Sequence, residues 1–295
     1  MLYPHHHDAP RWDGSSFADK RLFVHCEQGL GDAIQFVRYL PMVKTRGGTV
    51  IFEVWKPLLG LLRSFKCIDE LVELSSEGKS DVNFDLYVSL LDLPNIFGTT
   101  LETIPDEVPY IRADREKAKR LRQRLSGSVF KVGIVWAGKS THGNDHNRSC
   151  TLKSFSQLAQ IDGVQLYSLQ KDSAALQLTE LKMTIAIENL AEECEDFSDT
   201  AAVIENLELV ISVDTAVAHL AGAMGEDVWT LLPFAPDWRW MLGRDNSPWY
   251  LTMRLFRQPE PGCWEDVFQR VAEQLQILAD KYRIREQKTK ELSRT

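Results

Sequence analysis

The chain has 295 residues, of which 44% are apolar and 26% charged, with a formal net charge of −8. These values are typical of a globular protein long enough for two domains, and they exclude a disordered chain, a collagen and a coiled-coil rod. The acidic balance argues against nucleic acid or an anionic membrane surface as a general partner, so any cationic site must be local.

The five cysteines occur singly, without a C-x-x-C pair. This spacing does not support a disulfide framework or a cysteine-rich zinc site, and it favours a reducing, cytoplasmic location. We find neither a secretory signal nor an apolar run approaching the ~18 residues of a transmembrane helix. His5, His6 and His7 offer imidazoles to a metal, but they lie in the first 14 residues of an N-terminal extension (1–19), and we expect this terminus to be a solvated tail.

Short β-rich runs alternate with amphipathic helical stretches along the chain. In the first half we expect strands at 21–26, 49–54, 71–74 and 84–88, and helices at 32–45, 57–65 and 95–97. In the second half we expect strands at 129–136, 164–169, 207–213 and 228–232, and helices at 151–160, 201–206, 215–224 and 264–282. This alternation is typical of parallel sheets with crossover helices.

The composition changes between Ile104 and Ser128, where two prolines precede a charged helix and a Ser-Gly-Ser break. We interpret this segment as a domain boundary. The predicted organisation is an N-terminal Rossmann-like domain (20–115), a linker (116–127), a C-terminal Rossmann-like domain (128–262), a bracing helix (263–285) and a frayed, charged tail (286–295). The fold class is therefore α/β, with two parallel-sheet domains.

Residues 133–140 read G-I-V-W-A-G-K-S, which has the spacing of an NTPase phosphate loop. The middle residues continue a strand instead of turning, however, and a polar stretch follows in place of a helix. We therefore reject NTPase chemistry. Lys139 still lies at the carboxyl end of a strand, where open α/β sheets bind ligands.

The motif E-Q-G-L-G-D at 27–32 follows the first strand and precedes a helix. Gly29 and Gly31 permit a tight turn and the close approach of a ligand. Asp32 has two interpretations that the spacing leaves open, because it is either a functional carboxylate in the cleft or the N-cap of the helix. The third glycine of a dinucleotide fingerprint is missing, which disfavours a nicotinamide enzyme.

A second motif, S-V-D-T-A-V-A-H at 212–219, joins a buried strand to an alanine-rich helix. Asp214 or Thr215 is suited to cap this helix, whose N–H groups and dipole favour a diphosphate. Thr215 and His219 are four residues apart and share a helical face, and Ala216 lets a ligand come close. Whether His219 is structural or belongs to a site stays open.

Other polar side chains follow strands of the second half, and we expect their cations to converge on the edge that holds Asp214. These are Lys139, Arg148, Gln170 and Lys171. The cations among them suit a leaving diphosphate, although each is equally well explained as a solvated surface charge. Trp238 and Trp240 lie in an aromatic loop that favours either stacking on a base or sugar or packing of an Ω-loop.

The chain resembles the glycosyltransferase portion found behind tetratricopeptide repeats in bacterial proteins. The likeness lies in five ordered segments: EQGLGDAIQFVRYLP, WAGKSTHGNDHNRS, SLQK, SVDTAVAHLAGAMG and PFAPDWRWMLGRDNSPWY. That portion is similar to the lipopolysaccharide heptosyltransferases, of glycosyltransferase family nine and GT-B architecture. The resemblance implies that Asp32 is a catalytic base and that Asp214, Thr215 and His219 hold the donor diphosphate. Ala216 stands where heptosyltransferases usually carry glycine.

The resemblance also implies an inverting, metal-independent transfer of a hexosyl or heptosyl group from a nucleotide-sugar. We expect no cofactor, and a glycan, lipid-linked or protein acceptor. A tetratricopeptide-repeat domain or partner is an expected companion, and nucleic acid is not. Two alternatives stay open: a nucleotide-sugar epimerase or hydrolase on the same fold, and a non-catalytic nucleotide-sugar-binding module.

Overall fold

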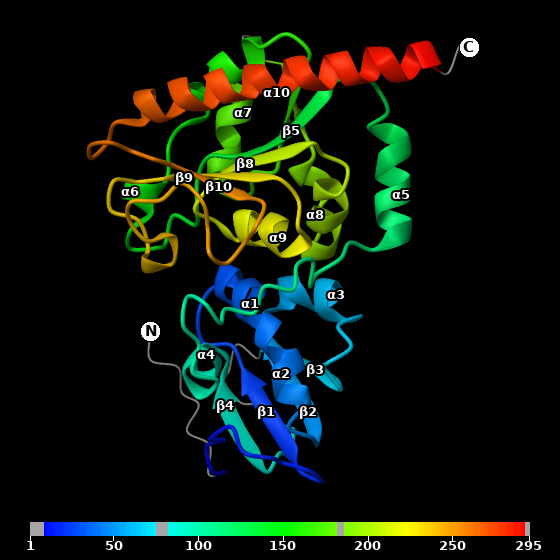
Figure 1. Ribbon diagram of the computed structural model, residues 1–295, viewed down its shortest axis with the longest axis vertical. Coiled ribbons are helices and arrows are strands. Elements are labelled where there is room, and N and C mark those ends of the chain that lie inside the picture. The colour runs from blue at the N-terminus through cyan, green and yellow to red at the C-terminus, as the bar shows by residue number, and fades with distance from the viewer. Residues whose placement is uncertain (1–8, 75–81, 182–185, 293–295) are drawn as a thin grey trace.

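A computed structural model describes residues 9–74, 82–181 and 186–292 (Figure 1). His5, His6 and His7 lie outside the described residues. The described chain forms two α/β bodies stacked along the long axis, the N-terminal one in blue and cyan (Figure 1). The N-terminal extension is not wholly a solvated tail, because Trp12 and Phe17 are buried in the core.

The N-terminal sheet has four parallel strands in the order β3-β2-β1-β4. Their bounds are β1 (Arg21–His25), β2 (Thr49–Val54), β3 (Glu70–Glu73) and β4 (Leu86–Ser89). The two central strands are almost wholly buried, as is usual for a parallel sheet covered on both faces. Between β2 and β3 lie η2 (Lys56–Leu58) and α3 (Leu59–Leu62), and after β4 come η3 (Leu90–Asp92) and α4 (Leu93–Ile96).

The helix expected over 32–45 is three consecutive segments. They are α1 (Leu30–Phe36), η1 (Val37–Tyr39) and α2 (Leu40–Lys44). Pro41 lies in the first turn of α2 and has no N–H to donate to the preceding turn, so a single regular helix is interrupted before it.

The second sheet has six parallel strands in the order β10-β9-β8-β5-β6-β7. Their bounds are β5 (Phe130–Val135), β6 (Val164–Ser168), β7 (Ile187–Asn189), β8 (Leu209–Val213), β9 (Val228–Leu232) and β10 (Met253–Arg257). The strand expected at 228–232 coincides with β9. The edge strands β7 and β10 have no counterpart in the sequence prediction, since both are short and carry charged residues.

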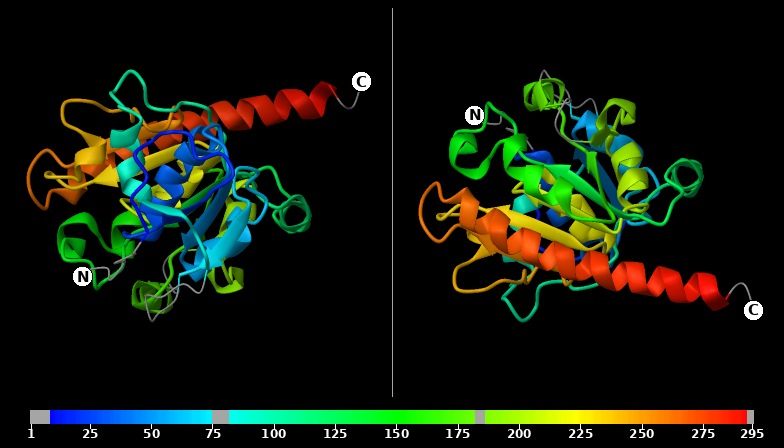
Figure 2. Two further views of the ribbon diagram at one scale, coloured as in Figure 1. Left: turned by 90° about the horizontal axis from the view of Figure 1, so that it is seen from below. Right: turned by 90° about the horizontal axis from the view of Figure 1, so that it is seen from above.

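Helices cover both faces of this sheet (Figure 2). They are α6 (Asp145–Arg148), η4 (Leu152–Gln160), η5 (Ser173–Leu176), α7 (Gln177–Leu181), η6 (Ala191–Glu193), α8 (Phe197–Ile204), α9 (Ala216–Met224), η7 (Trp238–Trp240) and α10 (Trp264–Leu292). The prediction placed the start of α8 at 201, but α8 begins at Phe197 because Asp196 and Asp199 form a capping box.

The charged tail predicted to fray after 285 is helical as far as Leu292, the last described residue. It continues α10 beyond the body of the protein (Figures 1 and 2). The segment contains helix-forming charged residues and no glycine or proline, which explains why the helix continues. Among the described residues, α10 is long, but neither it nor any other helix is apolar enough over a sufficient length to cross a membrane.

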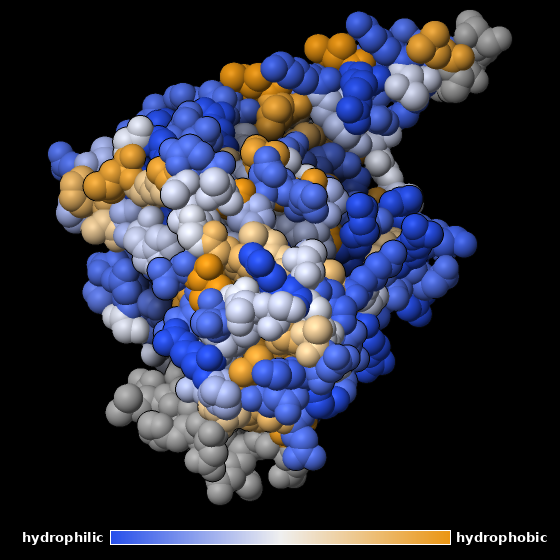
Figure 3. Space-filling view, turned by 60° about the horizontal axis from the view of Figure 1, so that its bottom comes forward, coloured by the Kyte–Doolittle hydropathy of each residue, from blue (hydrophilic) through white to orange (hydrophobic). Residues whose placement is uncertain are grey.

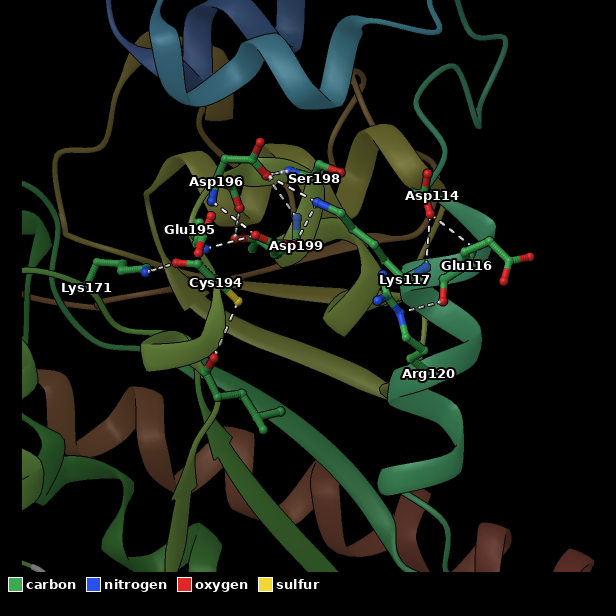
Figure 4. Close-up of polar contacts among 12 residues, drawn as sticks. Asp114, Glu116, Lys117, Arg120, Lys171, Cys194, Glu195, Asp196, Ser198 and Asp199 are labelled. Atoms are coloured by element: carbon green, nitrogen blue, oxygen red, sulfur yellow. Dashed lines mark hydrogen bonds and ion pairs between the residues drawn. The ribbon is translucent and has the colours of Figure 1, made fainter.

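The segment predicted as a linker contains α5 (Arg115–Arg124), which packs on α8 (Figure 4). Asp114 caps α5 by accepting from the N–H groups of Glu116 and Lys117, at 3.0 and 2.9 Å. Lys117 Nζ forms an ion pair with Asp199 Oδ1 at 2.7 Å. This end of α8 also touches the N-terminal body, because a Cβ at Gly60 of α3 would overlap the Asp196 carboxylate.

The face drawn in Figure 3 is largely hydrophilic, with small separate groups of apolar residues between charged ones. The apolar side chains lie mainly inside, on both sides of each sheet. On α10 the inward stripe consists of Val267, Phe268, Val271, Leu275 and Ala279. Burial of this stripe holds α10 on the C-terminal body.

Candidate active site

The G-x-G-D motif forms the turn from β1 into α1. Gly29 is the N-cap, and Asp32 is the third residue of the helix, so the interpretation of Asp32 as N-cap is wrong. Asp32 Oδ2 accepts from the Gly29 N–H at 2.8 Å, which closes the first turn from within the helix. The other oxygen, Oδ1, faces the C-terminal body.

The S-V-D-T motif forms the turn from β8 into α9. Thr215 takes the N-cap position, but its hydroxyl hydrogen-bonds to Ser212 Oγ at 2.8 Å, and no side chain among the described residues caps α9. Capping by Asp214 or by the Thr215 hydroxyl is therefore wrong. Burial raises the pKa of Asp214, while the charges of Arg148 and Arg239 oppose this rise.

The two turns come from different bodies and lie against each other, with α1 directly below α9 (Figure 1). A Cβ on Gly31 would lie 2.8 Å from Cδ2 of His219 and 3.6 Å from the Cα of Ala216. Glycine at 31 is therefore required for this close approach. The backbone of Ala216 lies against α1, so the space we expected for a ligand is partly used by α1.

His219 is enclosed at this seam, 5% exposed. Its Nδ1 lies 2.8 Å from the hydroxyl of Tyr250, and its Nε2 lies 4.0 Å from Asp214 Oδ1. Burial lowers the pKa of His219 well below its usual value, and the charges of Arg239 and Arg38 lower it further. His219 is therefore a neutral hydrogen-bonding group at neutral pH.

Arg239, in η7, joins the two bodies and was not among the residues that the sequence indicated. Its Nη2 forms an ion pair with Asp32 Oδ1, and its Nε donates to Gln35 Oε1 at 2.7 Å. Its Nη1 donates to Asp237 Oδ1 at 2.8 Å. The sequence signal for Arg239 was weak, because it is a single cation between two tryptophans. The loop was interpreted from its aromatic residues instead.

Arg38 makes a second connection between the bodies that the sequence did not indicate. The side chain is 4% exposed, with its guanidinium over the rings of Tyr110 and Tyr250. Its Nη1 donates to the Trp249 carbonyl at 2.8 Å, and its Nη2 donates to the Tyr110 hydroxyl at 2.8 Å. Arg38 thus holds the aromatic loop in place from the N-terminal body.

The predicted cations do not all converge. Arg148 Nε lies 3.4 Å from Asp145 Oδ1, and the charge of Arg148 lowers the pKa values of both Asp214 and His219. Lys171 Nζ instead donates to the carbonyl of Cys194, before α8 (Figure 4). Lys139 is exposed on the loop after β5.

Gln170 organises the loop after β5. Its Oε1 accepts from the N–H groups of Trp136 and Ala137, at 3.0 and 2.9 Å. Its Nε2 donates to the carbonyls of Ala137 and Lys171, both at 3.0 Å. Gln170 therefore shapes this loop with its whole amide group. The strand β5 includes Gly133 to Val135, which explains why the phosphate-loop spacing forms no phosphate loop.

The two predicted stacking rings differ in exposure. Trp240 is fully buried, and its ring centroid lies 5.2 Å from that of His219. Trp238 is 60% exposed and packs edge-on against Trp249. Trp240 therefore follows the loop-packing interpretation, and the ring of Trp238 faces solvent. In the described part of the chain, no group of three or more His, Cys, Asp or Glu side chains is placed to hold a metal ion.

No family model matches the chain. Protein FlbA of Caulobacter vibrioides is 26% identical over 290 residues, in an alignment covering 91% of this chain and 48% of FlbA. The chain thus spans about half the length of this curated relative.

Several solved glycosyltransferase structures are similar to the chain. The ADP-heptose lipopolysaccharide heptosyltransferase II of E. coli superposes with a TM-score of 0.64 at 13% identity, covering 88% of this chain and 99% of that one. A glycosyl transferase of family 9 from Veillonella parvula gives a TM-score of 0.61 at 11% identity, covering 93% and 98%. The iron-containing dodecameric glycosyltransferase TibC of enterotoxigenic E. coli gives a TM-score of 0.51 at 10% identity, covering 93% of this chain and 78% of that one.

These likenesses define the class of the fold. The chain is an α/β protein with two parallel sheets in the GT-B arrangement of the heptosyltransferases, as the sequence resemblance implied.

Proposed function

We propose that the protein is an inverting, metal-independent glycosyltransferase that moves a hexosyl or heptosyl group from a nucleoside-diphosphate sugar to an acceptor hydroxyl. The observation that carries this proposal is the contact between the Asp32 turn and the start of α9, made at Gly31 and His219 in a GT-B fold. A carboxylate and an uncapped helix N-terminus from different bodies supply a base and an anion site on either side of one reaction centre.

In this mechanism Asp32 accepts the proton of the acceptor hydroxyl, whose oxygen forms the new bond to the anomeric carbon. The bond between that carbon and the diphosphate breaks on the opposite side, so the product is inverted. The leaving diphosphate gains charge as it departs. The free N–H groups of α9, the hydroxyl of Thr215 and the guanidinium of Arg148 stabilise that charge without a metal.

The proposal assigns the acceptor to the N-terminal domain (20–115) and the donor to the C-terminal domain (128–262). Lys139 and Lys171 are more distant cations of the donor side, and the exposed ring of Trp238 is available to a base or sugar. A glycan, lipid-linked or protein acceptor in the cytoplasm, with a tetratricopeptide-repeat domain or partner to present it, completes the proposal.

The test is a panel of nucleotide-sugars, first for thermal stabilisation and then for transfer. A donor raises the melting temperature by mass action because it binds the folded state. Asp32→Asn is expected to lose transfer by roughly 10²–10⁴-fold, the usual contribution of general-base catalysis, while still binding donor. Asp266→Asn, which removes a surface ion pair on α10, is the matched control with unchanged transfer.

Other outcomes would identify the alternatives. Donor consumption without acceptor identifies an epimerase or hydrolase, and donor binding without turnover on any acceptor identifies a binding module. Full transfer by Asp32→Asn would overturn the assignment of the base.

A further inference from the structure

We infer that Arg239 serves two anions in turn, binding Asp32 in the donor-free protein and the donor diphosphate in the complex. The exchange makes Asp32 available as a base only when the donor is in place. This inference rests on the proposed function and adds to it an unassigned donor-binding residue together with an order of events.

The first observation is that both carboxylate oxygens of Asp32 are engaged. Oδ2 accepts from the Gly29 N–H at 2.8 Å, and Oδ1 is paired with Arg239 Nη2. The first bond belongs to the first turn of α1 and persists as long as α1 is folded. A hydroxyl that approaches Oδ1 as its proton acceptor therefore competes with the guanidinium for that oxygen.

The second observation is the position of Arg239 between the two turns. The side chain is 11% exposed, so its charge is little screened by water. That charge acts on Asp214 and His219, which lie beside and within the first turn of α9, and the charge of Arg148 acts on the same two residues. A diphosphate seated on α9 would therefore lie within the field of two guanidinium groups.

The third observation concerns which contact is able to yield. Asp237 also binds Arg239, through Nη1 at 2.8 Å, but it belongs to the same loop, two residues away, and accepts from the Arg239 backbone N–H at 3.1 Å. Asp32 belongs to the other body. A doubly charged diphosphate outcompetes a single carboxylate for a planar guanidinium, so the pair with Asp32 is the one that opens.

This exchange gives the reaction an order. The acceptor is deprotonated after the donor has drawn Arg239 toward α9, and before that point Asp32 is occupied. The loop of η7 then couples donor binding to the availability of the base, since its arginine contacts both Asp32 and Gln35 of α1.

The test is isothermal titration of ADP and of UDP into four proteins: wild type, Arg239→Gln, Asp32→Asn and the double variant. Arg239→Gln should weaken binding of the accepted nucleotide at least tenfold. Asp32→Asn should strengthen it several-fold, because the amide has one acceptor oxygen, which the Gly29 N–H takes, and Arg239 is released. The gain should vanish in the double variant.

Controls keep the result interpretable. Arg239→Lys retains the charge without the planar fork and should recover part of the lost affinity, which distinguishes loss of a contact from loss of folding. Arg244→Gln removes an arginine of the same loop that donates to Asn246, and it should leave the affinity unchanged.

An unchanged affinity in Asp32→Asn, or an equal gain in the presence and absence of Arg239, would overturn the exchange while leaving the proposed function intact if the wild type still transfers sugar. A wild-type protein that binds neither nucleotide nor any nucleotide-sugar and transfers nothing would refute the proposed function, and the exchange with it.

Discussion

Gly31 and His219 are in direct contact across the seam between the two bodies. A Cβ added to Gly31 would lie 2.8 Å from Cδ2 of the imidazole, which is closer than Cβ atoms in proteins approach other heavy atoms. The imidazole itself is fixed from the other side by the hydroxyl of Tyr250, at 2.8 Å. The contact therefore sets how closely the proposed base and the proposed diphosphate site approach each other.

We predict that Gly31→Ala forces the two turns apart. Overpacking of a well-packed seam typically costs about 1–3 kcal/mol, so the melting temperature should fall and donor binding should weaken. Differential scanning calorimetry and nucleotide titration measure the two effects. Gly143→Ala is the matched control, because a Cβ there meets no atom within 4 Å. Equal behaviour of the two variants would show that the seam is loose.

We predict that Tyr250→Phe alters the protonation pattern of His219. The variant loses the hydrogen bond at Nδ1 and leaves a buried ring nitrogen without that partner, at a cost of about 1–3 kcal/mol. The ¹⁵N shifts of the imidazole, which report the tautomer, should change. Tyr39→Phe loses a comparable hydroxyl bond, to Thr99 Oγ1 at 3.1 Å, and should leave those shifts in place. Unaltered shifts in Tyr250→Phe would contradict the assignment.

We predict that Gln170→Met disorders the loop after β5. Methionine has a similar length but no amide, so the N–H groups of Trp136 and Ala137 lose their acceptor. Stability should fall by roughly 2–4 kcal/mol, and hydrogen exchange at these two amides should accelerate. Gln165→Met, on a half-buried side chain that donates to the Leu166 carbonyl, should change neither amide. If the amides of Trp136 and Ala137 stay protected from hydrogen exchange in Gln170→Met, Gln170 does not have this role.

We predict a pH-dependent gain in stability from Glu53→Gln. Burial raises the pKa of Glu53 from 4.5 to about 7. The carboxyl is neutral in the folded protein below pH 7, so its contribution to stability is fully present below pH 4.5 and is lost as the pH rises through 7. Relative to wild type, the glutamine variant should gain stability between pH 4.5 and 8, by at most roughly 3 kcal/mol. Urea unfolding at both pH values measures the difference, with the exposed Glu265→Gln as control.

The sequence predicted most of the regular structure because the signals for it are local. Apolar β-branched runs such as 228–232 are buried on both faces of a parallel sheet and are recognised without knowledge of their neighbours. The interruption at Pro41 and the edge strand β10 were missed, since the run 32–45 reads as one amphipathic helix and Met253–Arg257 lacks a continuous apolar run.

The candidate site was predictable only in part. Asp32 follows a strand of the first sheet, and Asp214, Thr215 and His219 follow a strand of the second, so topology places each group at the ligand-binding edge of its own sheet. Lys171 and Trp240 have partners that the sequence did not indicate, a carbonyl before α8 for Lys171 and the His219 ring for Trp240.

The sequence by itself determined two parallel-sheet bodies and the two glycine- and alanine-rich turns, because hydrophobic period and turn chemistry act over a few residues. Only the tertiary structure decided what Asp32 binds. Its partner Arg239 is 207 residues away along the chain, in an irregular loop without a periodic pattern. An ion pair of this kind depends on how the two bodies pack against each other. Local secondary-structure propensity does not report on contacts between residues so far apart in the sequence.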